Sequence, residues 1–102
     1  NNLAKKATTL EVNEEYLVVE AEQQLWSDIQ YVENTTALLM AKRSYSEALT
    51  IISMMEENIS AFFDSVMVMD ENENIKTNRL ALLGRISRLA GQIADLSKIV
   101  QQ

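Results

Sequence analysis

Apolar residues recur at spacings of three and four along most of this chain, which is the spacing of one face of an α-helix. They form three successive stripes. The first stripe contains Val18, Ala21, Leu25, Ile29 and Val32. The second contains Ala48, Ile52, Met55, Ile59, Phe62 and Val66. The third contains Ile75, Leu82, Ile86, Leu89, Ile93, Leu96 and Val100. These stripes predict three long helices that each bury one face.

Polar residues between the stripes predict where these helices begin and end. Asn13 has the side-chain oxygen of a good N-cap, so the first long helix is expected to start there and to end near Lys42. Ser44 and Glu47 have the S-x-x-E spacing of a capping box at the start of the second long helix. The acidic run 70–74 separates the second long helix from the third.

The two ends of the chain and one apolar stretch complete the prediction. The last helix is expected to span residues 71–99, about 40 Å at 1.5 Å per residue, with Asp70 and Glu73 as its caps. Residues 1–8 predict a short N-terminal helix. Residues 66–69 are all apolar, which fits either a continuation of the second long helix or an extended segment.

Turn-forming residues are scarce, because the 102 residues include no proline and two glycines. A sheet of short strands needs many tight turns. The chain is therefore predicted to be one all-α domain, residues 1–102, built as an antiparallel helical bundle of three long helices plus a short N-terminal helix. Gly84 and Gly91 share a helix face, which predicts close approach of another helix. The start without methionine is interpreted as that of a C-terminal fragment of a longer chain.

The composition excludes several kinds of catalytic chemistry within this chain. There is no cysteine and no histidine, so thiolate metal sites and nucleophiles activated by histidine cannot form. The acidic run 70–74 lacks the glycine and glutamate of a calcium loop, and it is interpreted as helix caps and solvated charge. We expect no catalytic residue, metal or cofactor in this domain. The methionines are interpreted as core filling rather than as a groove for partner helices: Met54, Met55, Met67 and Met69.

The net charge of −6 argues against nucleic acid as a partner, because phosphates require lysine and arginine. The distribution softens this argument: residues 11–34 hold seven acidic and no basic side chains, whereas residues 76–98 hold five basic and one acidic. The candidate nucleic-acid-binding residues are Lys76, Arg79, Arg85, Arg88, Lys42 and Arg43. A solvated helix face explains these charges equally well.

Two aspartates are candidates for structural polar roles. Asp64 follows two phenylalanines and is expected to pair with Arg79 or to cap a helix end. Asp95 lies among apolar residues and is expected to need a hydrogen-bond donor. With no signal peptide and no apolar run of 18 residues, a cytoplasmic protein without a membrane span is expected.

Three sequence blocks in the second half of the chain resemble a known family. They are Phe62-Phe63-Asp64-Ser65-Val66-Met67-Val68-Met69, Asn78-Arg79-Leu80-Ala81-Leu82-Leu83 and Ala94-Asp95-Leu96-Ser97-Lys98. In order and spacing they resemble the C-terminal anticodon-binding (DALR-type) domain of the bacterial glycyl-tRNA synthetase β subunit, and the resemblance covers nearly the whole chain. Arginyl-tRNA synthetases end in a similar domain, which implies that residues 66–70 form an extended connection. Asn58 stands where the family commonly has proline, so residues 57–59 are expected to be less kinked.

The resemblance implies a function and a set of partners. It implies a domain that binds glycine tRNA at its anticodon and supports glycine–tRNA ligation catalysed elsewhere in the enzyme, where ATP is used. The implied partners are the synthetase α subunit and the rest of the β subunit in a heterotetramer, without DNA or a membrane. The alternative is a non-catalytic helical assembly module of the same or another multi-subunit enzyme.

Overall fold

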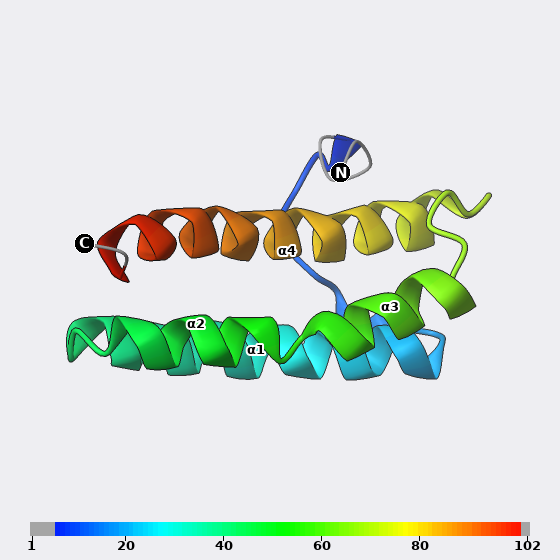
Figure 1. Ribbon diagram of the computed structural model, residues 1–102. Helices are drawn as coiled ribbons and strands as arrows, with labels where there is room; N and C mark the ends of the chain where they lie inside the picture. Colours follow the sequence, from blue (N-terminus) through cyan, green and yellow to red (C-terminus); the bar gives the residue numbers. More distant parts are fainter. Residues whose placement is uncertain (1–5, 101–102) are drawn as a thin grey trace.

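The computed structural model describes residues 6–100 as an all-α bundle (Figure 1). Its elements are the 3₁₀ turn η2 (Glu14–Tyr16) and the helices α1 (Glu20–Ala41), α2 (Tyr45–Ser53), α3 (Glu56–Ser65) and α4 (Glu73–Val100). Helices α1 and α4 run in one direction, and α2 followed by α3 returns in the opposite direction. The predicted fold class is confirmed. The predicted N-terminal helix falls mostly on residues 1–5, outside the described residues.

The core lies between the three layers of helix. Helix α1 packs against α2, α3 and α4, and α2 also packs against α4. The largest fully buried apolar side chains are Phe62, Leu25, Ile29, Leu82, Leu89 and Leu96. Each belongs to one of the three predicted stripes, so the spacing of apolar residues identified the buried face of every layer.

Helix α1 begins at Glu20, later than predicted. Asn13 does act as a cap, but of η2, where its side-chain oxygen accepts from the backbone N–H of Glu15 at 3.0 Å. Val18 is exposed, and Val19 has extended backbone, as β-branched residues prefer. The Glu22 carboxylate then accepts from the Val19 N–H at 3.0 Å, which caps α1.

The second predicted helix is interrupted at Met54 and Met55. There the backbone N–H groups donate three residues back, Met54 to Ile51 and Met55 to Ile52, both at 3.2 Å. This tighter turn separates α2 from α3 yet leaves Met55 in the core. Residues 57–59 themselves lie in the first turn of α3 and are helical, which agrees with the smaller kink expected where Asn58 replaces proline, whereas the continuous second helix that was predicted is wrong.

The connection 66–70 starts extended at Val66, as the family resemblance implied, but it bends at Val68 and Met69, where the Asp70 N–H donates to Val68 O at 2.9 Å. Val66 and Val68 are buried whereas Met67 and Met69 are exposed, which is the alternation of an extended strand. Met54 is exposed as well, so the interpretation of the methionines as core filling is right for Met55 and wrong for the other three.

Helix α4 is capped by Asn72 rather than by Asp70 and Glu73. The Asn72 side-chain oxygen accepts from the N–H groups of Asn74 at 2.9 Å and Ile75 at 3.2 Å. Asp70 instead stabilises the turn before the helix, because its carboxylate accepts from the N–H of Asn72 at 2.8 Å. An amide oxygen one residue before the helix has the geometry that orphan N–H groups require.

The two glycines of α4 have different surroundings. A Cβ atom at Gly84 would lie 2.7 Å from Leu10 Cδ2, so the absence of a side chain lets the N-terminal segment cross α4 closely. A Cβ atom at Gly91 would meet no atom of the described residues within 4 Å. The predicted close helix–helix approach at both glycines is therefore wrong. The close approach exists at Gly84, and its partner is a non-helical segment.

The turn between α1 and α2 holds Arg43 in the left-handed region, with φ 61°. Ser44 donates its N–H to Leu39 O at 2.8 Å, and Arg43 donates to Met40 O at 3.0 Å. This is the Schellman arrangement, which usually places glycine where Arg43 stands. Ser44 occupies the N-cap position of α2, but its side chain makes no capping hydrogen bond, so the predicted capping box with Glu47 does not form.

Replacing Arg43 by glycine is expected to stabilise the domain by about 1 kcal/mol, because glycine adopts this backbone conformation without a Cβ penalty. Urea denaturation measures the free energy of unfolding. Lys42→Gly is the matched control, since Lys42 has right-handed backbone and glycine there is expected to destabilise by about 0.5–1 kcal/mol. Equal destabilisation by both substitutions would show that Arg43 is not strained.

Candidate nucleic-acid interface

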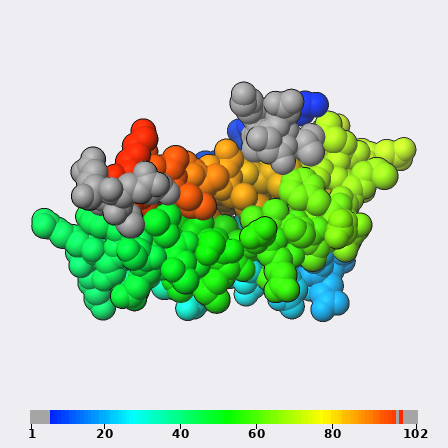
Figure 2. Space-filling model, viewed as in Figure 1, coloured from blue at the N-terminus to red at the C-terminus, as the bar shows by residue number. Residues whose placement is uncertain are grey.

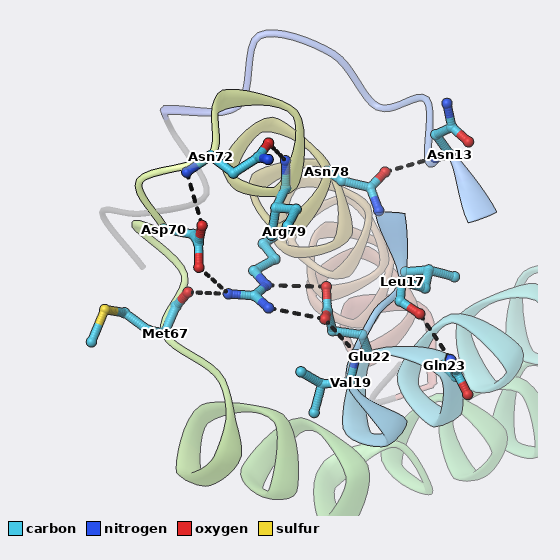
Figure 3. A network of polar contacts seen from close by, with 11 residues as sticks. Asn13, Leu17, Val19, Glu22, Gln23, Met67, Asp70, Asn72, Asn78 and Arg79 are labelled. Carbon is cyan, nitrogen blue, oxygen red and sulfur yellow. Dashed lines mark hydrogen bonds and ion pairs between the residues drawn. The ribbon is translucent and has the colours of Figure 1, made fainter. Parts of the chain in front are cut away.

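Among the described residues the most buried cation is Arg79, in the second turn of α4 (Figure 3). Its Nε donates to Glu22 Oε2 and its Nη2 to Glu22 Oε1, both at 3.1 Å. Its Nη1 donates to the backbone oxygen of Met67 at 2.6 Å and faces Asp70 Oδ2 at 3.4 Å. Arg79 is 4% exposed and Glu22 is fully buried. This two-pronged contact joins α4 to the start of α1 and to the connection 66–70.

The predicted pairing of Arg79 with Asp64 is wrong. Asp64 is exposed near the end of α3, and the connection 66–70 instead supplies Met67 O and Asp70 to Arg79. Arg79 has the structural role expected of it, with Glu22 as its main partner. Glu22 lies three and seven residues before Leu25 and Ile29, so its place on the core face was a signal in the sequence that indicated burial. Burial also removes Arg79 from the residues that RNA can reach.

A second cluster joins α4 to the middle of α1. Arg85 donates to both carboxylate oxygens of Glu33, and Arg88 Nη2 donates to Glu33 Oε2 at 3.1 Å. Arg85 also donates to Leu10 O at 3.1 Å and lies over the Trp26 ring, 4.8 Å from its centre. Two guanidinium groups thus share one carboxylate, which leaves surplus positive charge. The N–H donors of Arg85 are largely occupied by these contacts, whereas the Arg88 side chain is 50% exposed.

The cluster changes the acidity of Glu33. Partial burial raises the pKa of this carboxyl, but hydrogen bonds and charges from Arg85 and Arg88 outweigh burial and hold the pKa below its ordinary value of 4.5. Glu33 is therefore a carboxylate near neutral pH, and it anchors both arginines to α1.

The other predicted basic residues differ in their surroundings. Lys76 lies 3.2 Å from Glu73 Oε1 in an i,i+3 ion pair on the surface of α4. Lys42 and Arg43 are exposed at the end of α1, and neither forms an ion pair with any residue between 6 and 100. Asp95, expected to need a donor, is exposed and so can be hydrated. Water satisfies such a carboxylate without a protein partner.

The described residues contain neither a cluster of metal ligands nor a membrane-spanning helix. No group of three or more acidic residues in the described part of the chain is placed to hold a metal ion. No helix within residues 6–100 is long and apolar enough to cross a membrane.

Comparison with known proteins places this helical domain in a family. The chain matches the model of the DALR anticodon binding domain over residues 1–100 and belongs to that family. It is 45% identical over 100 residues to the glycine–tRNA ligase beta subunit of Desulforamulus reducens, an alignment that covers 98% of this chain and 14% of that protein. It is 38% identical over 100 residues to the beta subunit of Thermodesulfovibrio yellowstonii, covering 97% of this chain and 15% of that protein.

A third relative, the glycine–tRNA ligase beta subunit of Acinetobacter baumannii (strain AYE), is 40% identical over 98 residues, covering 95% of this chain and 14% of that protein. The chain thus spans about one seventh of the length of the curated relatives that it matches. No solved structure matches it. The family suggested by the three sequence blocks is confirmed.

Removing the charge of Glu22 is expected to destabilise the domain by about 3 kcal/mol, because Glu22→Gln leaves the buried Arg79 without its main anionic partner. Urea denaturation provides the measurement. Glu20→Gln, an exposed acid in the same first turn, is the control and is expected to change stability by about 0.5 kcal/mol or less. The double variant Glu22→Met with Arg79→Met is expected to recover most of the loss. Equal effects of Glu22→Gln and Glu20→Gln would contradict a stabilising ion pair.

The lowered pKa of Glu33 predicts how acid acts on the domain. A group with a lowered pKa in the folded state contributes stability above its unfolded pKa and loses it as pH falls through the folded pKa. Stability should therefore fall as pH drops below 4.5, the ordinary value. In Glu33→Gln this dependence is expected to be shallower, whereas the control Glu11→Gln, at an exposed position, should retain it. Urea midpoints measured on both sides of pH 4.5 test this expectation.

Proposed function

We propose that this chain is the tRNA-binding domain of a bacterial glycine–tRNA ligase β subunit and that it binds glycine tRNA at the anticodon. Membership of the DALR anticodon binding domain family supports RNA as the ligand. The similarity to glycine–tRNA ligase beta subunits supports the particular tRNA. The observation that carries the proposal is the exposed basic pair Lys42–Arg43, because a chain of charge −6 needs a local basic site to hold RNA.

The bundle concentrates available positive charge at one end. The C-terminal ends of α1 and α4 lie together, opposite the acidic N-terminal ends (Figure 1). Lys42 and Arg43 follow α1, and the exposed Lys98 lies in the last turn of α4. At the other end, Glu20 and Glu73 occupy the first turns of the same two helices. The exposed Glu47 and Asp95 lie near the same end, so the excess of positive charge there depends on the pair Lys42–Arg43. An RNA backbone would therefore be attracted to this pair rather than to the end that carries Glu20 and Glu73.

The proposed division of labour assigns catalysis to another part of the ligase. With neither histidine nor cysteine, the chain lacks the usual acid–base and thiol groups. Glycine activation with ATP would take place elsewhere in the enzyme, a cytoplasmic heterotetramer of α and β subunits. This domain would contribute affinity for tRNA and discrimination at the anticodon, where unpaired bases are accessible to protein side chains.

An assembly module is the second candidate function. An apolar groove of about 320 Å³ runs between α4 and the returning α2–α3 layer, along the boundary of green and orange helices on the face shown in Figure 2. Its apolar lining consists of Ile52, Met55, Ile59, Ile86, Ala90 and Ile93. An exposed apolar surface of this kind favours contact with protein. The two candidates make different predictions: tRNA binding depends on Lys42 and Arg43 if the domain contacts RNA, and on the apolar groove if it is an assembly module.

Reversing both charges of the pair, Lys42→Glu with Arg43→Glu, is expected to raise the KM for glycine tRNA in the intact ligase on the order of tenfold or more, because charge-assisted contacts to phosphate are lost. Glycine activation measured without tRNA should be unchanged. The control is Lys6→Glu with Gln24→Glu and Gln30→Glu, an equal change in net charge at three exposed positions away from this end. If both variants raise KM equally, the effect is one of overall charge. If neither does, the assembly module is favoured.

A further inference from the structure

A small cleft opens between α1 and α4 on the side of the Glu33 cluster. It has a volume of about 200 Å³ and is lined by Glu33, Thr36, Ala37, Met40, Arg88, Leu89 and Gln92. Pockets for drug-sized ligands occupy roughly 300–1,000 Å³, so this cleft suits a single flat ring system. Ala37, Met40 and Leu89 supply apolar surface against which such a ring can pack.

The polar groups of the cleft have hydrogen-bonding capacity that the domain does not use. The side-chain oxygen of Gln92 is buried and has no donor within the described residues. A buried acceptor without a donor costs free energy, which a ligand N–H would recover. Arg88 gives Nη2 to Glu33 and is otherwise half exposed. By contrast, the Thr36 hydroxyl is already spent, because it donates to Val32 O at 2.7 Å.

The cleft also lies next to the basic end of the bundle. Met40 lines the cleft and precedes Lys42 by two residues, about 3 Å along the helix axis. Arg85 and Arg88 share Glu33 on the other side of the cleft, so surplus positive charge flanks it at both ends. A strand held by its phosphates at Lys42 and Arg43 therefore has a ring-sized, polar-edged cleft within reach of its bases.

Resting on the proposed function, we infer that this cleft receives one unpaired base of the tRNA anticodon loop. The base packs on Met40 and Leu89, and its exocyclic amine donates to the Gln92 side-chain oxygen. Arg88 contacts the base edge or the adjoining phosphate. An acceptor at Gln92 selects cytosine or adenine, which present an exocyclic amine, over uracil, which presents a carbonyl oxygen at the corresponding position.

Filling the cleft tests whether a base enters it. Ala37 is exposed and lines the cleft, so Ala37→Phe occupies the space without altering a charge. Ala61→Phe is the matched control, because Ala61 is an exposed alanine that lines a separate cleft between α1 and α3. In the intact ligase, Ala37→Phe is expected to weaken binding of the glycine tRNA transcript about tenfold or more, the effect of losing one stacked base. Ala61→Phe should bind like the parent enzyme.

Changing the amide tests which base enters. The substitution Gln92→Met keeps the length of the side chain and removes its acceptor. The control is Gln24→Met, near the start of α1, whereas the cleft lies near the end of that helix. Transcripts in which each anticodon-loop cytosine or adenine is replaced in turn by uracil are compared with the unmodified one. At one position the parent enzyme and the control should bind the uracil transcript about fivefold or more weakly. Gln92→Met should lose this discrimination.

The outcomes separate this inference from the proposed function. If Ala37→Phe binds normally and Gln92→Met discriminates like the parent, while the reversal of Lys42 and Arg43 weakens binding, the cleft is not a base site and the proposed function stands. If the reversal is also without effect, RNA binding at this end is excluded. If Ala37→Phe weakens binding and Gln92→Met discriminates normally, a base enters but is selected by another group, which overturns the role of Gln92.

Discussion

The two-pronged contact between Arg79 and Glu22 is the interaction on which the arrangement of this domain depends. One guanidinium of α4 joins the start of α1, 57 residues away in sequence, and the connection 66–70 that precedes α4. Burying two charges is costly unless their hydrogen-bonding groups are satisfied. Here Glu22 also accepts from the Val19 N–H, and Arg79 also donates to Met67 O. The pair therefore sets where α1 begins and how the connection reaches α4.

The same contacts explain why counting charges misleads about function. Helix α4 holds all five basic residues of the second half, yet Arg79 and Arg85 are paired with carboxylates of α1. These arginines hold the layers together. A planar guanidinium is suited to this role because two of its N–H groups can donate to one carboxylate. The basic groups left for a ligand lie instead at the end of the bundle and beside the small cleft between α1 and α4. Position rather than number of charges decides which surface RNA can use.

The sequence predicted the buried faces better than the helix ends or the polar partners. Apolar spacing reports which side of the chain meets the core, and that side stayed the same through the break at Met54 and Met55, because a single 3₁₀ step hardly changes the phase of a helix. The spacing therefore could not reveal the break. Glu22 and Arg79 are 57 residues apart, and their pairing depends on how layers stack, which local pattern does not encode. The exposure of Lys42 and Arg43 depends in the same way on how the described helices pack around the end of α1.

The backbone conformation of Arg43 bears on the charge at the end of the bundle that carries Lys42, Arg43 and Lys98. Both α1 and α4 point their C-terminal ends there, and each such end carries a partial negative charge that repels phosphate. Basic side chains at this end must first offset that field before they can attract an anion. Arg43 does so from a left-handed position where glycine would be more stable, so its positive charge is held at this end at a cost in backbone strain. With glycine in its place the turn would be unstrained, and Lys42 and Lys98 alone would be left to offset the negative ends of the two helices.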